Sequence, residues 1–444
     1  MDRIRQRQRR LLRPDGLARR SSEARCHRHR CTVRRRTAAA PVTAQPTLAS
    51  VDDHRRLVAG LVTDTPNVQA TLAAAEGLVL AGAVDAPNPL PRFDNSAVDG
   101  YAVHAADISG ARRGQPVSLP VRRHIAAGNS APTTLAPGTT DKIMTGAPLP
   151  AGATGVVPVE LVDRCGQNAL FAHLARAGVN IRRLGEDIEA GRRLLEPGTT
   201  LRPLHTGMLA AVGVDRVPVR RRIRVALVST GTEIAHTSGT LGFGQIYESN
   251  SVMLASAVRH CGADVVACES VSDSVHRFRL VLDRVCAAAD VVITTGGISA
   301  GDHEVVKHAL QSREGMHFGG VALSPGKPQG AGRILGATVL AFPGNPLAAY
   351  VSFELFARPL LRRAMGMIDD ERPTVTAPLA HPVTATTGRT SIYLARRDTA
   401  GTITLATGPA RHGLRGVLDA DCLVRIDRDT TELPEGHPIT ARLL

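Results

Sequence analysis

Between residues 222 and 366, two kinds of hydrophobic pattern alternate along the chain. Short continuous apolar runs predict buried strands at 223–228, 264–268, 290–294 and 339–342. Between and after these runs, apolar residues recur every three or four positions, which predicts helices at 250–260, 274–288, 302–311 and 346–365. Because strands that alternate with helices usually pair in parallel, this segment indicates an α/β domain whose sheet is covered on both faces.

The pattern changes on either side of this domain. Helical spacing predicts helices at 51–62, 71–80 and 203–212, and short apolar stretches broken by Gly and Pro predict β structure elsewhere. A chain of 444 residues holds more than one domain, so we expect an α/β multidomain fold. Its expected parts are a tail and linker at 1–46, a mixed linker domain at 47–87 and 180–220, a β-rich module at 88–179, the α/β domain with its central parallel sheet at 221–368, and a small C-terminal β domain at 369–444. In an alternative division, part of residues 67–87 packs on the α/β domain.

The net charge of +14 is concentrated at the N-terminus. Residues 1–36 hold fourteen Arg against three acidic residues, a balance of +11 that leaves only +3 for the rest of the chain. This stretch has no hydrophobic period, so we expect it to be disordered. It is open to interpretation as a tail without function, a transit-like peptide, a weak polyanion binder, or a gene start placed too early. A specific nucleic-acid-binding function would rest on this tail alone.

Composition excludes several classes of protein. No window approaches 18 uninterrupted apolar residues, so a transmembrane helix is not expected. Aromatic residues make up 3% of the chain and Trp is absent, which argues against a stacking surface for single-stranded nucleic acid. Seven cysteines, an odd and sparse number, fit a reducing compartment, so we expect a cytoplasmic protein. The spacing of Cys26, His27, His29 and Cys31 matches no standard zinc finger.

Polar and Gly-rich segments follow all four predicted strands of the α/β domain. They are 229–233, 271–273, 294–302 and 343–346. In open parallel sheets, ligands bind beyond the carboxyl ends of the strands, so these four loops are expected to form one site. A single loop of this kind would be explained equally well as a tight turn.

The third loop has the composition of an anion site. Gly296, Gly297 and Gly301 let backbone N–H groups approach a phosphate closely, and Thr295 and Ser299 supply hydroxyl groups. The loop matches neither the phosphate-binding loop of nucleotide hydrolases nor the dinucleotide-binding fingerprint, so both of those functions lack their key residues.

Two further segments carry candidate chemistry. Lys327 lies between Pro325 and Pro328, whose rings restrict the backbone, and a cation held in this way suits an oxyanion; an ordinary surface turn is the alternative. Asp99 lies in a polar loop of the β-rich module, where its carboxylate could hold Mg²⁺ or act as a general acid or base; the alternative is an Asx-type turn.

At these residues the chain resembles a known family, the molybdopterin molybdenumtransferases, which comprise bacterial MoeA proteins and the E domain of gephyrin. The resemblance covers roughly residues 47–444. Its motifs occur in family order at 95–102, 145–147, 185–188, 245–250, 295–302, 325–328 and 343–346. Each motif is moderately specific, and the ordered set is highly specific.

The resemblance implies a molybdopterin-binding α/β domain and the last step of molybdenum cofactor synthesis. Adenylylated molybdopterin binds, its pyrophosphate is cleaved with Mg²⁺, molybdate is inserted at the dithiolene, and AMP leaves. It also implies a homodimer whose active cleft lies between the α/β domain of one subunit and the β-rich module of the other. A molybdopterin adenylyltransferase would supply the substrate, and molybdoenzymes or their chaperones would accept the product.

Residue roles follow from this resemblance together with the chemistry of the side chains. The expected catalytic residues are Asp99, Glu233, Lys327 and Ser299, and the expected Mg²⁺ ligands are Asp99, Glu233 and Asp273. Molybdate is expected at Lys327, Ser299 and Arg389. The residues expected to bind the pterin and nucleotide phosphates are Ser229, Thr230, Gly231, Thr295, Gly296, Gly297, Ser299, Gly301, Asp302, Pro325, Gly326, Pro343, Gly344 and Asn345.

The chain departs from the family pattern at three positions. Relatives often carry an acidic residue where Thr232 stands, a Lys where Ser324 stands, and a small hydroxyl residue where Ala348 stands. These departures keep two alternatives open beside the transferase: an enzyme like the molybdopterin adenylyltransferases, and a molybdopterin-binding paralogue without catalysis.

Overall fold

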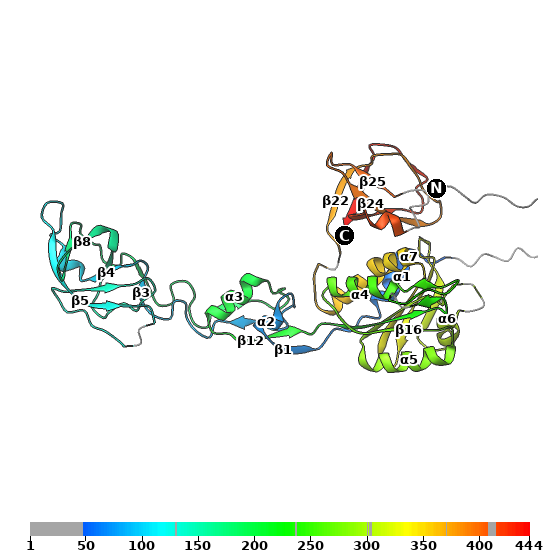
Figure 1. Cartoon of the computed structure of the whole chain (residues 1–444), viewed down its shortest axis with the longest axis horizontal. Coiled ribbons are helices and arrows are strands. Elements are labelled where there is room, and N and C mark those ends of the chain that lie inside the picture. The colour runs from blue at the N-terminus through cyan, green and yellow to red at the C-terminus, as the bar shows by residue number, and fades with distance from the viewer. Residues whose placement is uncertain are drawn as a thin grey trace, which may run out of the picture. The chain divides into compact units, whose positions relative to one another are not determined.

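The structure is a computed structural model of the whole chain (Figure 1). It describes residues 48–128, 131–235, 238–299, 301, 304–369, 371–406 and 414–444. The expectations for the Arg-rich tail, for its Cys and His residues and for Asp302 lie outside the described residues. Within the described part of the chain, none of the helices combines the length and the apolar character that crossing a bilayer requires.

The α/β domain is built on a six-stranded sheet with the order β16-β13-β17-β21-β20-β18. Its strands are β13 (Arg224–Thr230), β16 (Asp264–Val271), β17 (Val291–Thr295), β18 (Met316–Gly320), β20 (Pro328–Ile334) and β21 (Ala337–Phe342). Its helices are α4 (Asn250–His260), α5 (Val275–Ala288), α6 (Val305–Leu310), α7 (Pro346–Ser352), the π-helix η3 (Phe353–Ala357) and α8 (Arg358–Ala364). All four predicted strands and all four predicted helices are therefore present.

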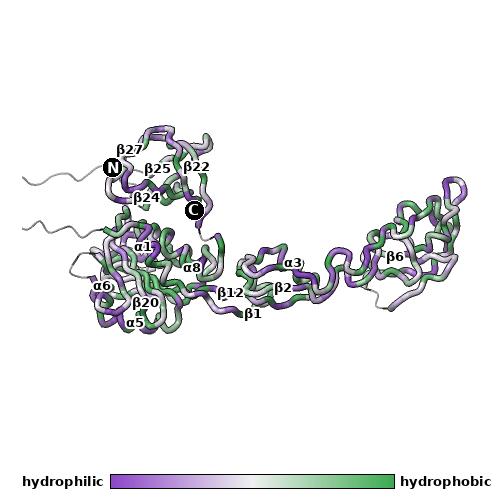
Figure 2. Tube along the Cα trace, turned by 180° about the vertical axis from the view of Figure 1, so that it is seen from behind, coloured by the Kyte–Doolittle hydropathy of each residue, from purple (hydrophilic) through white to green (hydrophobic). Residues whose placement is uncertain are grey.

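Helices cover both faces of this sheet, as the apolar strands predicted (Figure 1). Along β13, Val225 and Leu227 face a core that includes α4, α7, α8 and α1 (Val51–Ala59). Ala226 and Val228 face a second core with α5 and α6. Residues 225–228 of this strand are all buried because both faces of the sheet are covered, which explains the continuous apolar run. Helix α5 instead mixes hydrophilic and hydrophobic residues, as expected when only one side of a helix packs on the sheet (Figure 2).

The four predicted strands form a parallel sheet, and one edge of it carries two further strands that the sequence pattern did not reveal. Strands β16, β13, β17 and β21 pair in parallel, but β20 and β18 continue the sheet antiparallel. Both added strands contain glycines, which weaken a strand signal in the sequence. The glycines are required by close approach: a Cβ at Gly330 would lie 2.6 Å from the Phe318 ring, and one at Gly332 would lie 2.1 Å from the Gly315 carbonyl oxygen.

The segments before and after the β-rich module form small paired elements with a core of their own. They are β1 (Asn67–Thr71), α2 (Leu72–Ala75), β2 (Val84–Asp85), β11 (Arg193–Leu195), α3 (Pro203–Ala211) and β12 (Arg216–Arg220). The predicted helix at 71–80 is mostly wrong, because only 72–75 is helical. Strand β1, which precedes this stretch, pairs with β12 from Asn67 opposite Arg220 to Thr71 opposite Arg216. This pairing overrides the helix propensity of the Ala-rich stretch.

The β-rich module contains a sheet with the order β7-β4-β6-β5-β9-β8. Its elements are β3 (Asn95–Ser96), β4 (Gly100–Val103), η1 (Ala105–Ile108), β5 (Val117–Ile125), β6 (Thr140–Ile143), β7 (Gly155–Pro158), η2 (Val159–Leu161), β8 (Val162–Cys165), β9 (Asn168–Phe171) and β10 (Ile181–Arg182). Tyr101 and Phe171 pack edge to face in its core, with ring centroids 6.1 Å apart.

The C-terminal sheet has the order β19-β24-β26-β28-β22 and shares a strand pair with the α/β domain. Its elements are β22 (Thr374–Pro378), β23 (Val383–Thr384), β24 (Thr390–Arg397), β25 (Ile403–Leu405), η5 (Leu414–Val417), β26 (Cys422–Ile426), β27 (Glu432–Leu433) and β28 (Pro438–Leu443). Strand β19 (Leu323–Ser324) pairs in parallel with Thr390 and Ser391 of β24. Ile392, Leu394 and Leu423 of this sheet also join the core of the α/β domain.

Candidate functional site

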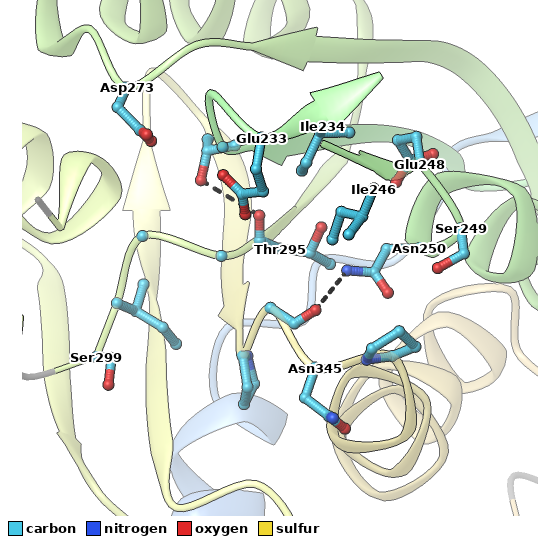
Figure 3. A pocket seen from close by; sticks show the side chains of 18 of the residues that line it. Glu233, Ile234, Ile246, Glu248, Ser249, Asn250, Asp273, Thr295, Ser299 and Asn345 are labelled. Atoms are coloured by element: carbon cyan, nitrogen blue, oxygen red, sulfur yellow. Dashed lines mark hydrogen bonds between the residues drawn. The ribbon is translucent and has the colours of Figure 1, made fainter. Parts of the chain in front are cut away.

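A cavity of about 520 Å³ lies at the carboxyl ends of four parallel strands. Residues that follow β13, β16, β17 and β21 line it together, as the sequence predicted from the loop positions (Figure 3). The expected site residues that line it are Thr230, Gly231, Glu233, Asp273, Thr295, Gly296, Gly297, Ser299, Pro343, Gly344 and Asn345. The four loops therefore contribute to one cavity.

Three of these loops touch through their backbones, and glycine is what allows the contact. Gly296 has a φ of +87°, and a Cβ there would lie 2.7 Å from the carbonyl oxygen of Thr230. A Cβ on Gly344 would in turn lie 3.4 Å from the Cα of Gly296. Larger residues would push the loops apart, so the glycine pattern of the sequence reflects loop packing as well as access for a ligand.

A network of hydroxyl groups supports the floor of the cavity. The buried Ser229 does not line the cavity; its hydroxyl donates to the Glu248 carboxylate at 2.9 Å and lies 2.8 Å from Ser251 Oγ and 3.2 Å from Thr295 Oγ1. Glu248 also accepts a hydrogen bond from the backbone N–H of Ser251, in the first turn of α4. These bonds tie the ends of β13 and β17 to α4.

Part of the predicted anion loop is already engaged by a carboxylate. The backbone N–H groups of Ser299 and Gly301 donate to the two carboxylate oxygens of Glu304, at 2.6 and 3.2 Å. Gly296 donates its N–H to the Phe342 carbonyl oxygen at 3.1 Å. Two amide donors of the loop are thus accepted by Glu304 of the same chain, and binding of a phosphate by this loop stays a prediction.

Two carboxylates that line the cavity suit a divalent cation. The Glu233 carboxylate has no hydrogen-bond partner among the described residues, while Asp273 Oδ2 accepts from the backbone N–H and the hydroxyl of Thr232, at 3.0 and 2.8 Å. Mg²⁺ keeps several waters and is usually bound by one or two carboxylates together with substrate phosphates, so this donor set fits it. No group of three or more potential metal-ligating side chains occurs within the described ranges.

Asp99 does not line this cavity. It lies on the β-rich module just before β4, with an exposed side chain. Its Oδ1 accepts hydrogen bonds from both the backbone N–H and the hydroxyl of Thr145, each at 2.7 Å. These bonds, with the nearby positive charge of Lys142, hold the pKa of Asp99 below its usual value, so the group is a carboxylate at neutral pH.

The lysine predicted to bind an oxyanion lies beside the cavity rather than on its wall. Pro328 lines the cavity, whereas Pro325, Gly326 and the exposed Lys327 do not. Arg389 is not a lining residue either, but it immediately precedes β24, which pairs with β19 at the start of the same turn. Two cations from distant parts of the sequence are therefore attached to neighbouring strands.

Several lining residues had no predicted role. They are Ile234, Ile246, Tyr247, Glu248, Ser249, Asn250, Ile298, Glu304, Pro328 and Pro346. Asn250 is 7% exposed and donates its side-chain N–H to the Gly344 carbonyl oxygen at 2.9 Å, which joins α4 to the loop after β21 (Figure 3). The motif at 245–250 was the available signal, because it is one of the motifs on which the family resemblance rests.

Comparisons with known proteins find matches along most of the chain. A family model for the MoeA N-terminal region (domain I and II) matches residues 49–213, and one for a probable molybdopterin binding domain matches residues 226–363. Molybdopterin molybdenumtransferase 2 of Mycobacterium tuberculosis is 46% identical over 396 residues, which cover 88% of this chain and 98% of that protein. Molybdopterin molybdenumtransferase 1 of the same organism is 31% identical over 423 residues, with coverages of 89% and 99%.

A solved structure resembles the whole described architecture. The crystal structure of the molybdopterin biosynthesis MoeA protein from Pyrococcus horikoshii aligns with a TM-score of 0.76 at 28% sequence identity. The alignment covers 89% of this chain and 99% of that one. The likeness therefore extends beyond the α/β domain to the other modules.

Proposed function

Because the chain belongs to the molybdopterin molybdenumtransferase family, we propose that it inserts molybdate into adenylylated molybdopterin and releases AMP. The observation that carries the proposal is the convergence of four strand-end loops on one cavity, where amide and hydroxyl donors lie beside two carboxylates. Phosphoanhydride cleavage depends mainly on positioning and on neutralising charge; the donors would position the phosphates, and a cation held by the carboxylates would offset their charge.

Each part of the substrate has a candidate partner. The loops around Thr295 and Pro343 would hold the phosphate groups, with Gly296 and Gly344 allowing close approach. Glu233 and Asp273 would hold Mg²⁺, which would offset the negative charge of the pyrophosphate. Molybdate, a dianion, would bind at the turn that carries Lys327, with Ser299 and Arg389 as further contacts.

We further propose that the active form is a homodimer. Asp99 does not line the cavity of its own chain, yet it is an exposed carboxylate that Thr145 holds in the charged form. Apolar side chains at the rim of the cavity, Ile246 and Tyr247, are exposed as well. A second copy that brings its β-rich module to this rim would cover the apolar side chains and add Asp99 to the site.

The cellular setting follows from the same proposal. The cysteines among the described residues are free, which suits the reducing cytoplasm. The substrate would come from a molybdopterin adenylyltransferase, and the finished cofactor would pass to molybdoenzymes or their chaperones.

The test is release of AMP from adenylylated molybdopterin in the presence of Mg²⁺ and molybdate. The full chain should release AMP, and the reaction should need no added ATP. Release at the background rate would refute the transferase, and a requirement for ATP would favour the adenylyltransferase-like alternative.

Asp99→Asn tests the role of the β-rich module. The change keeps the size of the side chain and removes its charge, so AMP release should fall by at least about tenfold while the unfolding midpoint in urea stays within error. Equal losses in rate and in stability would assign Asp99 a structural role.

A further inference from the structure

The turn at residues 324–328 carries Lys327 and is fixed through its backbone. The Lys327 carbonyl oxygen accepts a hydrogen bond from the N–H of Val321 at 2.7 Å. The Gly326 carbonyl oxygen accepts one from the side-chain nitrogen of Gln329 at 2.8 Å. The lysine side chain is exposed, but the backbone that carries it is held on both sides.

Gln329 connects this turn to helix α7. Its side-chain nitrogen donates one hydrogen to Gly326 and the other to the hydroxyl of Ser352, also at 2.8 Å. Ser352 is fully buried at the end of α7 and donates its own hydrogen to the Ala348 carbonyl oxygen at 2.7 Å. Every hydrogen in this chain of bonds is used. The reversed amide would place its oxygen against the Gly326 carbonyl oxygen, so the orientation is determined.

The amide of Gln329 is not explained by packing. Gln329 is only 2% exposed, and its side-chain oxygen is buried with no hydrogen-bond partner among the described residues. A buried acceptor without a donor destabilises a protein, and a methionine of similar shape would avoid that cost. What the amide provides and methionine cannot are the two donated hydrogen bonds that hold the turn to the helix.

The hydrogen bonds of Gln329 connect two segments that both reach the cavity. Helix α7 begins at Pro346, which lines the cavity together with the preceding loop. On the other side, Pro328 lines the cavity and is the neighbour of both Lys327 and Gln329. The bond between Gln329 and Ser352 therefore relates the phosphate loops to the position of the lysine.

We propose that Gln329 and Ser352 are positioning residues that set the location of Lys327 relative to the phosphate pocket and so determine the affinity for the oxyanion substrate. The inference rests on the proposed function, because it assigns the oxyanion to Lys327. It differs from that function in naming two buried residues that touch neither substrate nor metal.

The experiment compares oxyanion and nucleotide binding in Gln329→Met and Ser352→Ala. Isothermal titration of the full chain, with tungstate as a tetrahedral oxyanion like molybdate and with AMP in place of the dithiolene substrate, should show tungstate binding weakened by about tenfold in each variant. AMP affinity measured alone should stay within about twofold of the unchanged chain. In turnover, KM for molybdate should rise while kcat recovers at saturating molybdate.

Thr65→Val is the matched control for lost stability. Thr65 is also buried, at 3% exposure, and its hydroxyl donates to the Ala364 carbonyl oxygen at 3.2 Å, away from the cavity lining. This variant should lose stability without a change in tungstate affinity. The double variant of Gln329 and Ser352 should bind tungstate about as weakly as either single variant, because both changes break the same link.

The outcomes separate the inference from the proposed function. Unchanged tungstate affinity in Gln329→Met, or equal weakening of AMP and tungstate, would overturn the positioning role. Absence of tungstate binding in the unchanged chain would overturn it as well. If the unchanged chain binds tungstate more tightly than the variants but releases no AMP from the substrate, the positioning role stands and the proposed transferase reaction falls.

Discussion

A methyl group added at Gly296 tests whether contact between the loops builds the cavity. Gly296 and Gly336 both have a φ of +87°, but their surroundings differ. An alanine Cβ at 296 would lie 2.7 Å from the Thr230 carbonyl oxygen, whereas a Cβ at 336 would find no atom within 4 Å. The pair therefore separates backbone strain, common to both sites, from the collision at one of them.

The expected magnitudes follow from these two terms. The left-handed conformation costs an L-residue about 1–2 kcal/mol, which should be the whole loss in the free energy of unfolding for Gly336→Ala. Gly296→Ala should lose about 1–3 kcal/mol more, the range found when an extra group is forced into a packed region. The movement that relieves the collision separates the loops after β13 and β17, so AMP affinity should fall by at least about tenfold in this variant alone.

Two measurements check this expectation. Urea unfolding followed by circular dichroism gives the stability difference, and isothermal titration with AMP gives the affinity. Equal stability and equal AMP affinity in the two variants would show that the contact between Gly296 and Thr230 has no part in forming the site.

The remaining predictions concern protonation and the metal. Burial against Phe356 lowers the pKa of His54 from 6.5 to about 4, so between these values the unfolded chain binds a proton that the folded chain does not. Stability should therefore be unaffected by this group above pH 6.5 and should fall by about 2 kcal/mol between pH 7.5 and pH 5. His54→Leu should remove that share of the pH dependence in urea unfolding, and identical pH profiles would contradict the assignment. Thr232→Val should weaken Mg²⁺ binding several-fold, measured by Mn²⁺ competition in electron paramagnetic resonance, because Asp273 loses a hydroxyl that orients it. Thr232→Ser should restore the affinity, and equal Mg²⁺ affinity in all three proteins would refute the orienting role.

The strand-end loops could be predicted from the sequence because their position follows from a general property of parallel sheets. Once β13 and β17 are recognised as parallel neighbours, the loops that follow them must lie at the same edge, so Thr230 and Thr295 meet. The antiparallel strands β20 and β18 could not be found in this way, because glycines such as Gly330 serve contacts with distant residues and carry no strand signal of their own.

Other features depend on contacts between residues far apart in the sequence. Glu304 accepts hydrogen bonds from two amides of the loop because its side chain folds back onto it. The hydrophobic periodicity of the sequence does not predict the direction of this side chain. The family resemblance predicts Asp99 at the site, and its carboxylate lies on the β-rich module, which has a core of its own. The local sequence pattern contains no information on whether this module contributes to the cavity of its own chain or to that of a second copy.

The pairing of β19 with β24 makes the C-terminal sheet part of the folding unit that holds the lysine turn. Ile392, Leu394 and Leu423 fill a core to which α1, α4, α7, α8 and the central sheet also contribute side chains. A chain shortened before residue 369 would leave that apolar surface in water and would release one edge of the turn. In the full chain, the lysine turn and the C-terminal sheet should therefore unfold in one cooperative transition, with matching amide-exchange protection along β19 and β24.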